Sequence, residues 1–428
     1  MPNAGPATFG SGAEPQLNYA GEVTPPNLLL LGTDTSIGYC DNVIGSTIPV
    51  GDSYITIGPH VALDEQRKNF TLQMNYSPYF QMFQHLKQYN TVSHLFSADG
   101  TYRFATSFSI HIRDSFSYLT GTFQPPSAPG FIPGLGPPTS LNQAIVTPIA
   151  PEITNNSRVD AIYQKSTRTS FTVFGSYNRL DYLGAAGTGG NFFNTREVDA
   201  GMEYNYRVTN HTTMGLQYLF DNMSFGGSSV LLASSRTVTH SLFLSWAWQA
   251  TPSVTMTAFG GPQYILLGNY SGLSGSFPGI GMLSPGLANQ PQLQGAAGGT
   301  LTKQVKKTAF TLSAMRAVSN GGGLLTSVTS SSGDVGVRQH LMRRWDLSAD
   351  VMVSQAQELG SQFAGGQINS QTASFGVSHG LSERLSASLS YSASRERTQG
   401  AVPFAANFNV NRITLSFSFN AKGVSLGH

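Results

Sequence analysis

Residues 383–400 read ERLSASLSYSASRERTQG, and between Leu385 and Ala393 every odd position is apolar while every even position is serine. Successive side chains of a β-strand point to opposite faces of its sheet. This stretch therefore predicts a strand with one apolar face and one polar face, and the fold depends on what contacts each of them.

The same two-residue period recurs along the whole chain, whereas no comparable stretch shows a sustained helical period. An all-β fold follows. Further examples are NFTLQMNYSPYF (69–80), SFSIHIRDSFSY (107–118), REVDAGMEYNYRV (196–208) and RITLSFSF (412–419).

The connections between these stretches alternate between two kinds. Tight polar turns, such as 64–68 and 382–384, take turns with longer segments rich in Gly, Pro, Ser or Asn, such as 183–192 and 319–324. Outer-membrane barrels combine short periplasmic turns with longer extracellular loops in this way. We expect a leader at 1–28, a barrel of about 18 strands (16–18) at 29–420 and a tail at 421–428. The strands should start near Leu30 and finish near Phe419, and an even count places both ends on the short-turn side.

Composition separates a membrane barrel from a soluble β-protein. Charged residues make up 11% and hydrophobic residues 40% of the chain, against about 25% charged residues in a typical soluble protein. A tilted membrane strand needs about 9–11 residues, and most of the expected strands are at least that long. In lipid an unpaired backbone group costs several kcal/mol, so the sheet must close on itself. We predict a closed antiparallel transmembrane β-barrel, with a soluble sandwich, propeller or solenoid as the alternative.

Several classes of function lack support. A formal charge of +2 gives no reason to expect nucleic acid as a partner, and the single cysteine, Cys40, excludes an intrachain disulfide and argues against structural zinc. The chain has no apolar run near the ~18–20 residues of a membrane helix and no HExxH or phosphate-binding glycine motif. Residues 1–18 lack the basic start and apolar middle of a secretory signal, so we expect either that a signal has been removed or that this start is not the natural one. We expect no enzyme, cofactor or metal site. His85 should lie near the extracellular end, but nothing in the sequence indicates a serine or aspartate as its catalytic partner.

Ionisable residues in the polar register are expected to face the lumen and to filter solutes by charge. The alternative, which stays open, is that these residues only hydrate and brace the barrel wall. These candidates are Asp99, Arg103, His111, Arg113, Asp160, Glu197, Asp199, Glu203, Arg207, Asp334, Arg338, Asp346, Asp350 and Arg412. Asp114 and Arg316 fall in the lipid-facing register, so we expect both near the outer rim or displaced by a bulge.

Aromatic residues near short turns are expected at the periplasmic membrane interface, where amphipathic rings are favoured. They are Tyr102, Phe104, Trp246, Trp248 and Trp345. Two long loops, 121–155 and 267–292, mix Pro and Gly with large apolar residues. We expect 121–155 to narrow or cap the lumen, although covering the rim or packing on a neighbouring barrel would require the same composition.

Four motifs carry a resemblance to a known family: MNYSPYFQMFQ (74–84), IRDSFSYLTGTF (112–123), RAVSNGGGLL (316–325) and VRQHLMRRWDLSADVMVSQ (337–355). Over roughly residues 30–420 the chain resembles the beta-barrel porin family of Gram-negative outer membranes, including the large barrels of soil acidobacteria. The resemblance implies an outer-membrane location and, from members that accompany exopolysaccharide systems, polysaccharide as a cargo. Such barrels usually end in an aromatic residue, whereas here NAKGVSLGH follows Phe419.

Together these observations predict a porin-like channel in the Gram-negative outer membrane for passive diffusion of small hydrophilic solutes or saccharides. At 16–18 strands a barrel leaves an aqueous lumen. The alternative is a plugged structural or adhesive surface protein that binds partners through its external loops. Outer-membrane lipid is the expected surrounding, and the sequence leaves a monomer and a homotrimer open.

Overall fold

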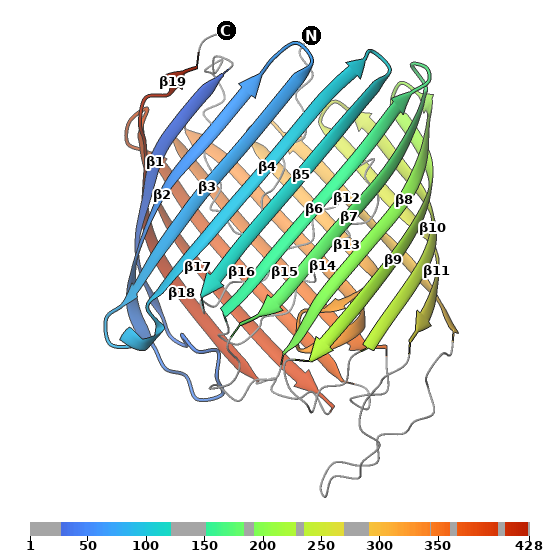
Figure 1. Ribbon diagram of the computed structural model, residues 1–428. Helices are drawn as coiled ribbons and strands as arrows, with labels where there is room; N and C mark the ends of the chain where they lie inside the picture. The colour runs from blue at the N-terminus through green and yellow to red at the C-terminus, as the bar shows by residue number, and fades with distance from the viewer. Residues whose placement is uncertain are drawn as a thin grey trace, which may run out of the picture.

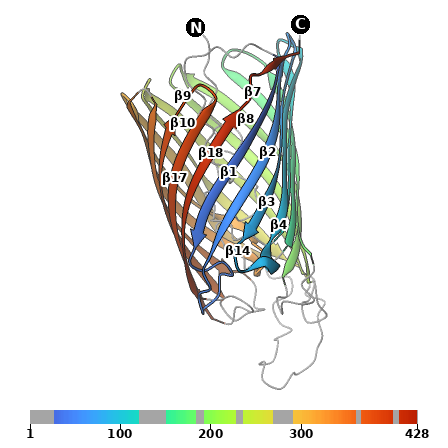
Figure 2. The same cartoon turned by 90° about the vertical axis from the view of Figure 1, so that its left-hand side faces the viewer.

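One closed antiparallel sheet makes up the protein (Figures 1 and 2). The computed structural model describes residues 27–120, 151–183, 192–227, 235–268, 291–342, 344–359, 366–400 and 407–426. Each of the 18 long strands pairs with its neighbours in sequence, and β1 (Leu28–Cys40) also pairs with β18 (Phe408–Asn420), joining Gly32–Cys40 to Arg412–Asn420. In Figure 2 this seam appears where blue β1 lies beside red β18. The predicted barrel of 18 strands is confirmed, and one short extra strand is added to it.

The remaining strands follow in chain order. The first half contains β2 (Asp52–Gln66), β3 (Phe70–Phe83), β4 (Thr91–Ala105), β5 (Phe108–Thr120), β6 (Pro151–Gln164), β7 (Thr169–Tyr182), β8 (Phe193–Thr209) and β9 (Thr212–Gly227). The second half contains β10 (Ser235–Thr251), β11 (Val254–Leu267), β12 (Pro291–Val305), β13 (Thr308–Gly321), β14 (Leu325–Met342), β15 (Trp345–Glu358), β16 (Gln367–Gly380) and β17 (Leu385–Gln399). A short 3₁₀ turn, η1 (Lys87–Tyr89), and strand β19 (Val424–Ser425) complete the set. Within these ranges no helix has the length and apolar character needed to cross a bilayer.

The alternation seen in the sequence separates the two faces of the barrel wall. On β17, Leu389 and Tyr391 are 48% and 46% exposed on the outside, whereas Ser394 and Glu396 are buried inside. Large apolar side chains cover the outer face of the other strands in the same way. An apolar surface suits hydrocarbon. The backbone suits it as well, because every strand of the closed sheet has a hydrogen-bonding neighbour on both sides.

The two ends of the barrel differ in their connections. Short turns, such as the one between Ala105 and Phe108, lie at the upper end in Figure 1, where β1 begins and β18 ends. The strand ends that flank the longer connections lie at the opposite end, as predicted. One boundary was wrong, because residues 151–155 belong to β6 and not to a loop. The rest of the predicted constricting loop, 121–150, and residues 269–290 of the second long loop lie outside the described residues.

A part of the wall turns into the lumen. Strand β13 pairs with β12 only over Thr308–Arg316, and β14 pairs with β15 only from Val328 onward. We call residues 317–327, which leave the wall between these points, the inner hairpin. Its turn uses Gly322 and Gly323, whose φ angles of 60° and 85° lie in the left-handed region that glycine adopts without steric cost.

The chain beyond Phe419 continues the sheet. Val424 and Ser425 form β19, which pairs with Leu29 and Leu28 of β1. The backbone amide of Ala421 donates to the carbonyl of Leu31 at 2.8 Å, and that of Leu426 donates to Asn27 at 2.9 Å. The tail therefore gives the first residues of β1 a partner that β18 is too short to supply.

Removing residues 421–428 should lower the free energy of unfolding by about 1–3 kcal/mol, because two backbone hydrogen bonds worth about 1 kcal/mol each and their flanking contacts are lost. Urea unfolding in detergent, followed by heat-modifiable gel migration, measures this change. A Val424→Thr variant keeps the backbone pairing and should behave like the parent chain. Equal stability of the truncated and full chains would refute the stabilising role of the tail.

Candidate functional site

The inner hairpin packs into an apolar bed on the inward face of the barrel. Leu324 and Leu325 are fully buried against Leu180, Tyr182 and Phe192 near the outer ends of β7 and β8. Two further clusters extend this bed over β7–β12, where they meet residues that enter the lumen from β13. They consist of Phe174, Leu219, Phe243, Phe259 and Ala296, packed by Met315 and Ala317, and of Phe193, Met223 and Phe225, packed by Val318.

Hydrogen bonds fix the hairpin to strands that are not its neighbours in the sheet. The Tyr182 hydroxyl donates to the Gly322 carbonyl, and the Phe193 amide donates to the Gly323 carbonyl, both at 2.8 Å. The Ser327 hydroxyl donates to Thr237 Oγ1 of β10 at 2.6 Å. Because these partners lie on β7, β8 and β10, the hairpin crosses the lumen and braces one wall against the other.

The two-residue period alone does not predict this inner hairpin, although the sequence contains a signal for it. On β9 the inward residues Leu219, Met223 and Phe225 are apolar, as are the outward residues Leu216 and Tyr218. A strand that is apolar on both faces is covered on both faces. The alternation was interpreted as apolar outside and polar inside throughout, and that interpretation is wrong for the outer half of β7–β11.

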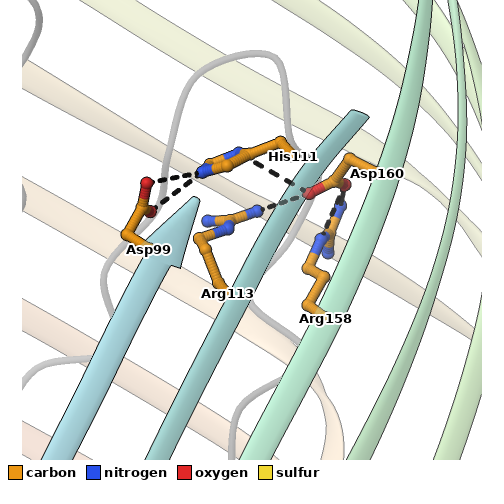
Figure 3. A network of polar contacts seen from close by, with 5 residues as sticks. All are labelled: Asp99, His111, Arg113, Arg158 and Asp160. Atoms are coloured by element: carbon orange, nitrogen blue, oxygen red, sulfur yellow. Dashed lines mark hydrogen bonds and ion pairs between the residues drawn. The ribbon is translucent and has the colours of Figure 1, made fainter. Parts of the chain in front are cut away.

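A charged network lies on the inward face of β4–β6 (Figure 3). Asp160, which is 0% exposed, accepts hydrogen bonds from Arg113 Nη2 at 2.9 Å and from Arg158 Nε at 2.8 Å. The Nε2 atom of His111 lies 2.9 Å from both carboxylate oxygens of Asp99, and its Nδ1 atom lies 4.0 Å from Asp160. The sheet register explains the grouping, because His111 stands directly opposite Asp160 and Arg113 directly opposite Asp99.

This network combines the guanidinium groups of Arg113 and Arg158 with the carboxylates of Asp99 and Asp160. Two guanidinium groups share Asp160, and the Arg158 guanidinium also lies 4.1 Å from the centre of the Phe174 ring. The Nε of Arg113 makes no hydrogen bond with any residue in the described part of the chain. A guanidinium has five N–H donors, so this wall can attract anionic or polar solutes that pass it.

A second group, of opposite sign, lies on β8 and β9. Glu197, Asp199 and Asp221 are all buried, and one carboxylate oxygen from each lies within 4.8 Å of the others. Asp199 Oδ2 accepts from the Ser176 hydroxyl at 2.7 Å, and Glu197 Oε2 accepts from Asn320 Nδ2 of the inner hairpin at 3.4 Å. Two like charges 4 Å apart repel by about 4 kcal/mol at an effective dielectric constant of 20, so an ionised cluster needs compensation.

Most of the other predicted lumen residues lie apart from these two groups. Glu203 is buried further along β8, where it interacts electrostatically with Arg158 and Asp160, whereas Arg103 and Arg207 lie exposed towards the short-turn end. Asp346 forms an ion pair with His340, and the Arg412 guanidinium lies 5.7 Å from the centre of the Tyr54 ring. The remaining candidates, on β14 and β15, are Asp334, Arg338 and Asp350. Their role in selectivity stays a prediction.

The predicted interface aromatics cluster at the short-turn end. Tyr102 and Phe104 contact each other edge to face with ring centres 4.6 Å apart. Trp246 stacks on Trp248 at 5.7 Å, and Trp345 stacks on His379 at 4.2 Å. Their assignment to the membrane interface stays a prediction.

Of the two charged residues in the lipid-facing register, Asp114 departs from the expectation. Asp114 lies in the middle of β5, at no register shift, so neither the rim position nor the bulge predicted for it is found. Its carboxylate accepts hydrogen bonds from Ser157 Oγ at 2.5 Å and Asn155 Nδ2 at 3.2 Å, which offsets part of its cost on the outer face. Arg316 is exposed on the outer face at the last residue of β13 that pairs with β12.

His85 has a partner that the sequence did not mark. Its Nδ1 lies 3.0 Å from Asp52 Oδ1, and Asp52 Oδ2 accepts from the backbone amides of His85 and Leu86, each at 2.8 Å. This carboxylate therefore holds the turn that follows β3.

Comparisons with known proteins find similarity in structure alone. No protein-family model matches the sequence, and no curated protein matches it either. Among solved structures, OpdO of Pseudomonas aeruginosa is similar with a TM-score of 0.46 at 10% identity, over 93% of this chain and 98% of that one. OpdK of Pseudomonas aeruginosa with vanillate gives 0.43 at 11% identity, over 92% and 99%. The FrpB iron transporter of Neisseria meningitidis gives 0.45 at 10% identity over 87% of this chain, which spans 63% of the FrpB chain.

Proposed function

We propose that the protein is a channel of the Gram-negative outer membrane, through which small hydrophilic solutes diffuse passively. The closed barrel of 18 strands carries this proposal, because barrels of 16–18 strands enclose more space than their own side chains fill. An even number of antiparallel strands with short turns at one end is also typical of single-chain bacterial outer-membrane barrels. Saccharides remain the cargo implied by the family resemblance.

In this proposal the inner hairpin is the constriction. It crosses the lumen from β13–β14 to β7 and β8, so solutes must pass beside it. The charged network around Arg113 and Arg158 and the acidic group on β8 and β9 then lie on different parts of the wall, where they filter solutes by charge.

A plugged surface protein is the second candidate, and the buried apolar clusters under the hairpin favour it. In that case the barrel is an anchor and its external loops bind partners. Conduction separates the two candidates.

Purified protein inserted into a planar lipid bilayer should produce stable current steps in potassium chloride. Such steps follow from a water-filled path along the polar inner wall. A bilayer that stays sealed, although the same sample shows heat-modifiable gel migration, would refute the channel and support the plugged anchor.

Replacing Leu324 and Leu325 together by serine should release the hairpin and raise the single-channel conductance. Each buried leucine contributes about 1.5–3 kcal/mol to docking, so their loss removes most of the apolar attachment of the turn. Leu381→Ser, at an exposed position of the turn after β16, is the control and should leave the conductance unchanged. A double variant with unaltered or smaller conductance would show that the hairpin does not limit the path.

Asp160→Asn should shift the selectivity of the channel towards anions, because Arg113 and Arg158 lose the carboxylate that they share and the lumen gains positive charge. The reversal potential in a potassium chloride gradient measures this shift. Asp114→Asn removes the same charge from the outer face nearby and should have little effect. Equal shifts in the two variants would contradict a filter at Asp160.

We further propose that the chain does not act as an enzyme and that His85 has a structural role. Its neighbour Asp52 already accepts hydrogen bonds from the backbone amides of Ser53, His85 and Leu86, which is the environment of a carboxylate that fixes a turn. His85→Ala should therefore leave channel conductance unaltered, and loss of a lipid- or peptide-cleaving activity in this variant would contradict the proposal.

A further inference from the structure

The acidic group on β8 and β9 is compact enough to surround a single ion. Glu197, Asp199 and Asp221 are 4%, 2% and 8% exposed, and their nearest carboxylate oxygens lie within 4.8 Å of one another. No lysine or arginine in the described part of the chain forms an ion pair with Glu197 or Asp221. The hydrogen bonds from Ser176, Asn178 and Asn320 come from neutral groups, so they cannot neutralise the carboxylates when these are ionised.

A neutral residue next to this group provides an independent sign of a missing ligand. Thr239 of β10 stands directly opposite Asp221 in the sheet register, on the same inward face, and directly opposed side chains have Cβ atoms about 4.5–5.5 Å apart. Thr239 is 1% exposed, and its hydroxyl makes no hydrogen bond with any described residue. The Oδ1 atom of Asp221 also lacks a hydrogen-bond donor within the described ranges. Buried polar atoms normally have a partner, so these two oxygens, on directly opposed residues, can accept a ligand at this group.

We propose that Glu197, Asp199, Asp221 and the Thr239 hydroxyl bind one calcium ion in the lumen wall. Calcium takes 6–8 oxygen ligands at 2.3–2.6 Å, so oxygens on opposite sides of it lie about 5 Å apart, and it accepts several carboxylates at once. Magnesium binds at 2.0–2.1 Å, keeps several waters and uses only one or two carboxylates. The number of carboxylates and the separation of their oxygens therefore favour calcium.

The register explains how three strands build the site. Asp199 of β8 stands opposite Asp221 of β9, which in turn stands opposite Thr239 of β10. Glu197 adds a second carboxylate from the same face of β8, two residues from Asp199. Because Glu197 also accepts a hydrogen bond from Asn320, the ion would lie next to the root of the inner hairpin. The sequence predicts no metal site, because Asp221 and Thr239 are distant from Glu197 and Asp199 along the chain and only the sheet register brings them together.

Isothermal titration of calcium into the full chain tests the proposal. The protein is refolded into detergent micelles, which keeps it free of lipopolysaccharide and the divalent ions that lipopolysaccharide binds, and is treated with a chelator beforehand. We expect one calcium ion per chain, with a Kd below about 1 mM, and weaker binding of magnesium. Calcium should also raise the temperature at which the folded gel band is lost, because a ligand that binds only the folded state stabilises it.

Two variants and a matched control locate the ion. Asp221→Asn should weaken calcium binding at least about tenfold, and Thr239→Val, which removes only the hydroxyl, should weaken it by a smaller factor. Asp334→Asn removes one carboxylate from the inward face of β14, outside the three-residue group, and should bind calcium like the parent chain. Absence of calcium binding by the parent chain, unchanged binding by Asp221→Asn, or an equal loss in Asp334→Asn would each overturn the proposal, whether or not the barrel conducts.

Discussion

The hydrogen bonding between β1 and β18 is the constraint on which the rest of the structure depends. A sheet with a free edge cannot remain in hydrocarbon, because each unpaired backbone group there costs several kcal/mol. The seam pairs nine residues of β1, from Gly32 to Cys40, with β18, and β19 extends it to Leu28 and Leu29. Once the seam is closed, the outer face can be apolar and the inner face polar along the same strands, which is the property that the proposed channel requires.

Closure also determines what can happen inside. The wall presents its side chains to a confined space, and register rather than sequence distance decides which of them meet. Asp160 thus lies close to Arg158 of its own strand and Arg113 of the neighbouring strand, while Glu197, Asp199 and Asp221 meet on β8 and β9, beyond β7. The inner hairpin adds contacts across the lumen that no pair of neighbouring strands could provide.

The sequence predicts the barrel well because its period of two is a local property. The apolar odd positions of residues 385–393 face outward as expected. The number of strands in the barrel equals the predicted 18, and the first and last strands lie within a few residues of their predicted positions. The inner hairpin could not be predicted in the same way. The segment Gly321–Gly323 looks like an ordinary loop, and only contacts with Tyr182 and Phe193 distinguish it from one. Asp52 likewise becomes the partner of His85 only when β2 and β3 pair.

The contacts that the inner hairpin makes across the lumen also affect how the barrel could assemble. Closing the seam directly means bringing together residues as far apart as Tyr39 and Ile413, and such distant pairing is slow because chain entropy must be lost first. Contact between Tyr182 and Gly322 spans only 140 residues and would fold the growing sheet back on itself earlier. The barrel would then close in two steps, and the contact between the inner hairpin and β7 would form in the first step and persist in the folded protein.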